Sequence, residues 1–125
     1  MVILDTSILI SALKGDSKAI AAIESYKGKE QMGITVMNKY ELMRGAGFLE
    51  AGIIDALISS MLVYDLNDSG TSAAVEVYAS LKKKGRMINE FDVLIAGIAL
   101  ANEQAIVTMD GDFQKVSGLS VVLVK

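Results

Sequence analysis

Short, uninterrupted apolar runs alternate along this chain with segments of helical periodicity, and this alternation constrains the fold more than any other feature. The runs VIL at residues 2–4 and VVLV at residues 121–124 contain no polar residue, so both faces of these strands are expected to be buried. Strands that alternate with helices are joined by crossovers, which produce a parallel sheet covered by helices on both faces. The sequence therefore predicts an α/β fold with three layers.

The expected elements follow from apolar spacing and from the residues that begin and end helices. Strands are expected at residues 2–4, 31–35, 62–66, 105–108 and 121–124. Helices are expected at residues 7–14, 16–25, 38–48, 49–61, 68–84 and 91–102. Asp16, Asn38, Asp68 and Asn89 are the expected first caps of helices, and Gly85 is expected to end the long one. With 125 residues and no repeat, the chain is expected to form one domain over residues 1–125.

Composition limits the chemistry that this chain can perform. It has no Cys and no His, which excludes thiolate metal sites and imidazole as a base or a ligand. Carboxylates would then hold a hard cation such as Mg²⁺ or Mn²⁺. The net charge of -3 disfavours a protein that binds nucleic acid over a large surface, but clustered acids that bind metal would account for part of that charge.

The apolar content is high, at 52% hydrophobic residues with a mean hydropathy of +0.44. No apolar run approaches the ~18 residues of a membrane span. The first residues, MVILDTSILISAL, are interrupted by Asp5 and lack a basic segment, so a signal peptide is not expected and the predicted location is cytoplasmic. Such an apolar chain is expected to bury part of its surface against a partner.

Four acidic residues from separate segments are expected at one edge of the sheet. In open parallel sheets, ligands bind at the carboxyl ends of the strands, where the strand order reverses. Asp5 follows the first strand and Asp110 the fourth, while Glu41 and Asp92 lie near the starts of helices whose first turns belong to the same edge. Converging carboxylates repel one another, and no Lys or Arg inside these motifs is expected to be buried with them. A divalent cation would relieve this repulsion.

Each acid also has a purely structural interpretation. Asp5 could cap a helix. Glu41 and Asp92 each lie three residues after an Asn, where a capping-box partner belongs, and Asp110 could form an Asx-turn. Asp112 competes with Asp110 as the fourth acid, and it could instead cap a short turn through Phe113. The expectation of a metal site therefore depends on the joint placement of the acids.

The motifs around these acids resemble those of the PIN domain family, specifically the VapC-type toxin ribonucleases. They are LDTS at residues 4–7, YELMRGA at 40–46, GRMINEFDVLIA at 85–96 and VTMDGDF at 107–113. This resemblance spans essentially the whole chain. It implies a five-stranded parallel sheet flanked by helices, and an endoribonuclease dependent on Mg²⁺, with Mn²⁺ as a substitute. It also implies homodimerisation and inhibition by a cognate, VapB-like antitoxin.

The resemblance assigns roles to particular residues. Asp5, Glu41, Asp92 and Asp110 match the acidic quartet that binds metal and catalyses hydrolysis, with Asp110 preferred to Asp112. Thr6 and Thr108 match hydroxyl positions near the metal, and Asn38 stands where the family often has Thr or Ser.

RNA binding also requires positive charge. Lys39, Lys84, Arg44 and Arg86 are the candidates, although lysines at the end of a helix also complement its dipole. The few aromatic residues show no stacking platform of the kind that single-strand-binding proteins use. The third and fourth helices carry an apolar set for which core packing is the default, although the high apolar content of the chain indicates that some members are exposed: Met43, Phe48, Leu49, Ile53, Leu57, Ile58 and Met61. The family resemblance implies a groove for an antitoxin segment.

Two other interpretations remain open from the sequence. One is a PIN-fold module that binds RNA or protein without catalysis. The other is a phosphotransfer or receiver-type domain, which also uses acids at the carboxyl edge of a parallel sheet. A receiver requires two adjacent acids after the first strand and a Lys after the last, whereas this chain has only Asp5 at the first position and a terminal Lys125 at the second.

Overall fold

Five parallel strands form the centre of the molecule in a computed structural model that describes residues 1–47 and 51–125. The strands are β1 (Val2–Leu4), β2 (Met32–Thr35), β3 (Leu62–Tyr64), β4 (Ala105–Thr108) and β5 (Val121–Leu123). Their order in the sheet is β3-β2-β1-β4-β5, and every neighbouring pair is parallel. The predicted α/β fold with a five-stranded parallel sheet is confirmed.

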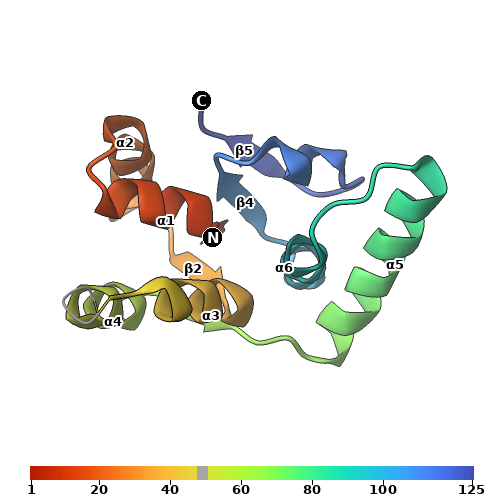
Figure 1. Ribbon diagram of the computed structural model, residues 1–125, viewed down its shortest axis with the longest axis horizontal. Coiled ribbons are helices and arrows are strands. Elements are labelled where there is room, and N and C mark those ends of the chain that lie inside the picture. The colour runs from red at the N-terminus through yellow and green to blue at the C-terminus, as the bar shows by residue number, and fades with distance from the viewer. Residues whose placement is uncertain (48–50) are drawn as a thin grey trace.

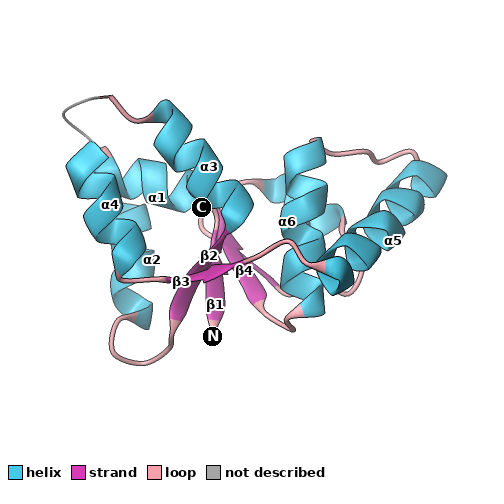
Figure 2. Ribbon diagram, turned by 90° about the horizontal axis from the view of Figure 1, so that it is seen from below, coloured by secondary structure: helices cyan, strands magenta, loops and turns pink. Residues whose placement is uncertain are grey.

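Helices cover both faces of this sheet (Figure 1). They are α1 (Thr6–Leu13), α2 (Ser17–Tyr26), α3 (Val36–Gly45), α4 (Ala51–Ser59), α5 (Asp68–Lys84) and α6 (Glu90–Ala101), with a 3-10 turn η1 (Gly111–Lys115) before β5. Figure 2 shows α1, α2 and α4 on one side of the strands and α5 and α6 on the other, with α3 near the carboxyl edge. Within the described residues, no helix combines the length and apolar character needed to cross a membrane.

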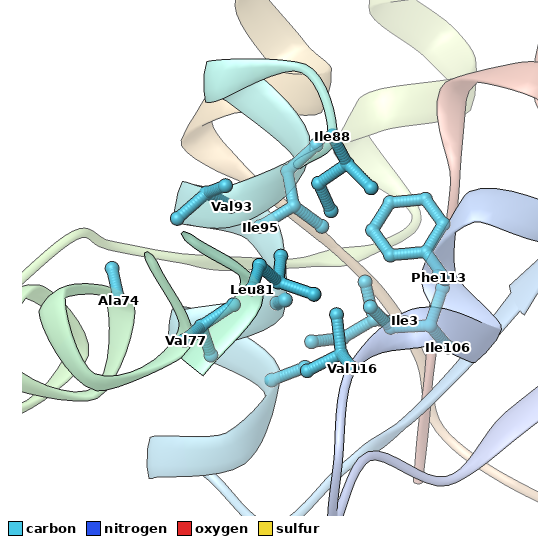
Figure 3. Packing of buried hydrophobic residues seen from close by; sticks show 12 residues of the cluster. Ile3, Ala74, Val77, Leu81, Ile88, Val93, Ile95, Ile106, Phe113 and Val116 are labelled. Atoms are coloured by element: carbon cyan, nitrogen blue, oxygen red, sulfur yellow. The ribbon is translucent and has the colours of Figure 1, made fainter. Parts of the chain in front are cut away.

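Each face of the sheet has its own hydrophobic core. The core under α5 and α6 is built on Ile3 and Ile106 of the strands and closed by Phe113 of η1 (Figure 3). The core under α1, α3 and α4 is built on Val2, Leu4, Ile34 and Val107, which point to the opposite face. Because β1 and β4 supply buried residues to both cores, their sequences are continuously apolar. This arrangement fixes the carboxyl ends of the two central strands side by side.

Helices α5 and α6 pack unusually closely at Gly97. A Cβ atom at this position would lie 2.7 Å from the Cβ and the backbone nitrogen of Ala74 and from the carbonyl oxygen of Gly70. Small residues thus allow the two backbones to approach each other. This contact ties α5 to α6, whose first turn carries Asp92.

Two predicted helix caps are wrong, and the reason is the same for both. Thr35 and Asn67 are the N-caps of α3 and α5, so Asn38 and Asp68 lie inside these helices. In each pair, Thr35 with Asn38 and Asn67 with Asp68, both side chains can cap a helix. Spacing in the sequence alone does not select between them. The caps Asp16 and Asn89 are confirmed, as is Gly85, which ends α5 with a positive φ of 66°.

The region between α3 and α4 departs from the predicted boundaries. Helix α3 ends at Gly45, before the expected end at Phe48. Two members of the predicted apolar set, Phe48 and Leu49, lie outside the described residues. Of the other members, Met43 and Ile53 are exposed while Ile58 is buried.

Candidate active site

The acidic residues meet at the point where the strand order of the sheet reverses. Strand β1 lies between β2 and β4, and Asp5 follows β1 directly, while Asp110 follows β4 after one intervening residue. The residues around this point enclose an open pocket of about 360 Å³. Its lining consists of Asp5, Thr6, Ser7, Glu41, Asn89, Asp92, Asp110 and Asp112. Joint placement at the carboxyl edge, expected from topology, is therefore observed.

Asp5 is held by side chains rather than used as a helix cap. It occupies the N-cap position of α1, but its carboxylate accepts no hydrogen bond from the helix backbone. Instead, Oδ2 accepts from the hydroxyls of Ser7 and Thr108, both at 2.8 Å. The second oxygen, Oδ1, has only a long contact of 3.5 Å from Asn38 Nδ2. Asp5 as a whole is 5% exposed. Two hydroxyls fix Oδ2, while Oδ1 keeps lone pairs for a ligand.

A second set of hydrogen bonds positions Glu41. Thr6 donates its hydroxyl proton to Glu41 Oε1 at 2.9 Å and accepts from Asn38 Nδ2 at 3.0 Å. Asn38 is itself fixed because its Oδ1 accepts from the backbone and hydroxyl of Thr35 in a capping box. Since Thr35 is the cap, Glu41 lies in the second turn of α3 and not in the first turn as predicted. Its capping interpretation is therefore wrong, and its side chain reaches the pocket.

Burial and the negative charges of all the other acids of the pocket raise the pKa of Asp92. Burial is the main reason why the pKa of Asp92 is raised from 3.8 to about 7. The remaining causes are the negative charges of Asp5, Asp110, Glu41 and Asp112, in that order. Asn89, and not Asp92, is the N-cap of α6, and its Oδ1 accepts a hydrogen bond from the backbone nitrogen of Phe91. A carboxyl that is costly to ionise, in a pocket of like charges, makes this pocket a candidate functional site.

Asp110 and Asp112 differ in the contacts that their carboxylates already make. Asp110 Oδ1 accepts from the backbone nitrogen of Asp112 at 2.9 Å and so caps η1. The capping role foreseen for Asp112 thus belongs to Asp110. Asp112 Oδ1 pairs with Lys115 Nζ at 2.9 Å. Asp110 keeps its Oδ2 for a ligand, while Asp112 already has a cation beside it.

The residues of the pocket fit a hard divalent ion. Among residues 1–47 and 51–125, no three carboxylates close tightly enough to form a cage for a metal. Mg²⁺ does not require such a cage, because it keeps several water ligands and binds through one or two carboxylates together with substrate phosphates. An open pocket with oxygen donors and no imidazole or thiolate matches that preference.

Ser7 is the residue of this site that sequence reasoning missed. Its hydroxyl donates to Asp5, lies 3.2 Å from the hydroxyl of Thr108, and accepts from the backbone nitrogen of Met109 at 3.0 Å. It thereby ties the end of β1 to the end of β4. The motif LDTS contained this Ser, but its role depends on the position of β4 beside β1, which the motif alone does not reveal.

The four basic candidates for RNA binding are exposed but do not line the pocket. Lys84 donates to Ser117 Oγ at 2.8 Å. Arg86 lies in the connection from α5 to α6, three residues before Asn89. Arg44 lies over the ring of Tyr40, at 5.2 Å from the ring centroid. The structure thus places Arg44, Lys39 and Arg86 on segments that lead into the pocket.

Comparison with known proteins identifies the family. Residues 2–119 match the PIN domain, and the chain belongs to the PIN domain family. It is 28% identical, over 93% of its length and 92% of the relative's, to the tRNA(fMet)-specific endonuclease VapC of Shigella flexneri. Similar solved structures include VapBC2 from Rickettsia felis bound to a promoter DNA fragment, with a TM-score of 0.86, 23% identity and 97% coverage of both chains. Another is VapBC-1 from nontypeable Haemophilus influenzae, with a TM-score of 0.84, 26% identity, and coverage of 97% and 96%.

These matches confirm the resemblance to VapC-type PIN domains that the sequence motifs indicated. They also exclude the receiver-type interpretation, since the match to the PIN domain covers nearly the whole chain.

Proposed function

We propose that this chain is a Mg²⁺-dependent endoribonuclease that hydrolyses RNA phosphodiester bonds in the acidic pocket, as the toxin of a VapBC-type pair. The observation that carries the proposal is the convergence of acids from four segments, in which Asp92 is affected by the charge of every other acid. Lys115 is the one cation within 4.0 Å of these carboxylates in the described part of the chain. Such a site favours a divalent cation and, through it, a phosphate.

The residues that would hold the ion are Asp5, through Oδ1, which has only the long contact from Asn38, together with Asp92 and Asp110. When bound, a divalent ion neutralises charge on the phosphate and lowers the pKa of bound water. Glu41 either completes the ligand set or orients the attacking water through the oxygen that Thr6 does not occupy. Because the chain has no His, the proton of that water would go to a carboxylate, or the ion would supply the nucleophile as hydroxide.

The surrounding hydroxyls and amide keep these carboxylates in place. Ser7 and Thr108 hold Asp5, while Thr6 and Asn38 hold Glu41. Fixed orientation of ligand carboxylates is what such outer contacts contribute to metal sites. The pocket is thus arranged before substrate arrives.

The substrate is tested by mapping cleavage of total RNA, with and without EDTA. The similar VapC of Shigella flexneri is named for tRNA(fMet), so initiator tRNA is the first candidate to examine among the fragments. New 5′ ends that appear with Mg²⁺ and vanish with EDTA support the proposal. RNA that remains intact under every divalent ion, or the absence of any stabilisation by Mn²⁺, would favour a non-catalytic module.

An antitoxin is the proposed partner, because the similar solved structures are of VapBC pairs from toxin–antitoxin systems. An apolar groove of about 430 Å³ between α1, α3 and α4 would receive its segment. It is lined by Ile10, Leu13, Lys14, Leu42, Gly45, Ile53 and Ile54. Placing Asp at Ile53, which is 59% exposed, should release the chain from inhibition by a VapB-like antitoxin without reducing RNA cleavage.

We also propose that the chain forms a homodimer, as the resemblance implies. Several apolar side chains outside the groove are exposed, among them Val75 of α5. Burial of such a surface against a second copy would stabilise the pair. Light scattering should give the mass of a dimer, and a monomer at high concentration would contradict this part of the proposal.

A further inference from the structure

Two aromatic rings and a guanidinium group form a continuous strip beside the acidic pocket. Tyr40 of α3 and Phe91 of α6 meet edge to face, with ring centroids 5.7 Å apart and planes at 64°. The guanidinium carbon of Arg44 lies over the Tyr40 ring, 5.2 Å from its centroid. We call Phe91, Tyr40 and Arg44 the aromatic strip. The sequence showed no stacking platform because its two rings lie fifty-one positions apart and meet only in the fold.

Both rings of the strip directly precede an acid of the pocket in the sequence. Tyr40 precedes Glu41 on α3, and Phe91 precedes Asp92 on α6. Both helices contribute their acids to the pocket lining. Tyr40 is 52% exposed, so contact with Phe91 and Arg44 leaves about half of the surface of this residue open to solvent. This exposed surface is available to a molecule that extends out of the pocket.

We propose that the aromatic strip stacks an unpaired base of the RNA next to the phosphodiester bond that is cut. This inference rests on the proposed ribonuclease function and adds how the substrate is held. Bases stack on exposed Tyr and Phe rings with little dependence on sequence, and Arg contributes through its planar cation. The substrate segment at the site is accordingly single-stranded RNA, from a loop or an end, whose base is free to leave its neighbours.

The charges on α3 favour RNA over a protein partner at this strip. The pocket itself is acidic and repels phosphate wherever metal does not offset it. Arg44 and the exposed Lys39 place positive charge on the same helix as Tyr40. Phosphates on either side of the cut bond would therefore meet cations just outside the pocket. A protein segment inserted for its apolar character would instead fit the groove lined by Ile53 and Leu13, which lies elsewhere on α1, α3 and α4.

A binding experiment separates stacking from catalysis. Anisotropy of a fluorescein-labelled single-stranded RNA is followed in EDTA, with every variant made in the Asp5→Asn background so that no cleavage occurs. Tyr40→Ala should weaken binding roughly 5-fold to 150-fold, which is the range for loss of one stacked base. Tyr40→Phe should bind as the parent does, because the ring is retained. The labelled RNA annealed into a full duplex should bind equally to all variants.

Tyr78 provides the matched control. It is another exposed tyrosine with a cation over its ring, Lys82 at 5.9 Å from the centroid, but it lies on α5 and does not line the acidic pocket. Tyr78→Ala should leave single-strand binding unchanged. An equal loss for Tyr78→Ala and Tyr40→Ala would overturn the proposal, because the effect would then be general.

A fluorescent reporter tests stacking directly. The chain has no Trp, so Tyr40→Trp introduces a single indole at the strip. Its emission should be quenched when single-stranded RNA is added and should stay unchanged with duplex RNA. Emission that stays constant while the RNA binds would overturn the proposal.

The outcomes also distinguish this proposal from the proposed function. If wild-type protein cleaves RNA and Tyr40→Ala binds and cleaves it as well as wild type does, the stacking role is refuted and the ribonuclease remains. If the wild type cleaves nothing with any divalent ion, the proposed function fails regardless of the strip. A change in molecular mass for Tyr40→Ala by light scattering would show that the strip is a contact between subunits, which also overturns the proposal.

Discussion

Replacing Asp92 with Asn should stabilise the metal-free protein at neutral pH. The pKa of Asp92 is raised from 3.8 to about 7, chiefly by burial and then by the neighbouring carboxylates. The folded protein therefore binds this proton more tightly than the unfolded chain does. The stability linked to it is fully present below about pH 4 and is lost as the pH rises through about 7.

The size of the effect follows from the size of the shift. A rise from 3.8 to about 7 corresponds to about 4 kcal/mol, at roughly 1.4 kcal/mol for each pKa unit. The side chain of Asp92 is only half-buried, so solvent screening reduces this value, and we expect about 1–2 kcal/mol. That is a substantial fraction of the stability of a small domain.

The measurement is urea unfolding in EDTA at several pH values between about 4 and about 8. The free energy of unfolding of Asp92→Asn minus that of wild type should be small at the acid end and should grow with pH. Asp55→Asn, which changes an exposed carboxylate on α4, is the control and should give a difference that stays flat. Added Mg²⁺ should stabilise wild type more than Asp92→Asn.

The opposite result would refute the reasoning. If Asp92→Asn is no more stable than wild type at about pH 8 in EDTA, neither burial nor the other acids make Asp92 costly to ionise. The pocket would then be a set of independent structural carboxylates.

Two further predictions concern packing and positioning. Gly97→Ala should lower the free energy of unfolding by about 1–3 kcal/mol, because the added methyl group would lie 2.7 Å from Ala74. The control is Gly52→Ala on α4, where the methyl group meets nothing within 4 Å, and it should raise the free energy of unfolding by roughly 0.5–1 kcal/mol. Equal effects of the two substitutions in urea unfolding would contradict the close contact. Ser7→Ala removes one of the two hydroxyls that hold Asp5 and should lower RNA cleavage about 10-fold to 100-fold with little change in thermal stability, so an unchanged rate would show that Ser7 does not position the carboxylate.

Much of the fold was predictable because its signals are local. Continuous apolar strands such as VIL before Asp5 indicated burial on both faces, and the structure places their residues in both cores. The parallel sheet and its carboxyl edge followed from the alternation of elements. Helix starts were less predictable, because Thr35 and Asn38 are both good caps and only the hydrogen bonds of the folded chain select Thr35.

The site was predictable as a set of acids but not in its contacts. Topology was sufficient to expect Asp5, Glu41 and Asp92 at one edge of the sheet. Long-range pairs such as Ser7 with Thr108 and Tyr40 with Phe91 depend on which strands and helices lie side by side, and no local pattern encodes that. The preference for Asp110 over Asp112 stays a prediction, to which the pairing of Asp112 with Lys115 adds support.

The most direct test of the acidic pocket as a metal-dependent ribonuclease site is RNA cleavage by wild type, Asp5→Asn and Asp55→Asn at increasing Mg²⁺ concentration. Wild type and Asp55→Asn should cut the RNA at the same positions, with activity that rises with Mg²⁺ and is abolished by EDTA. Asp5→Asn should fold, as judged by circular dichroism, and should leave the RNA intact at every Mg²⁺ concentration. Cleavage by folded Asp5→Asn at the wild-type rate would contradict the account.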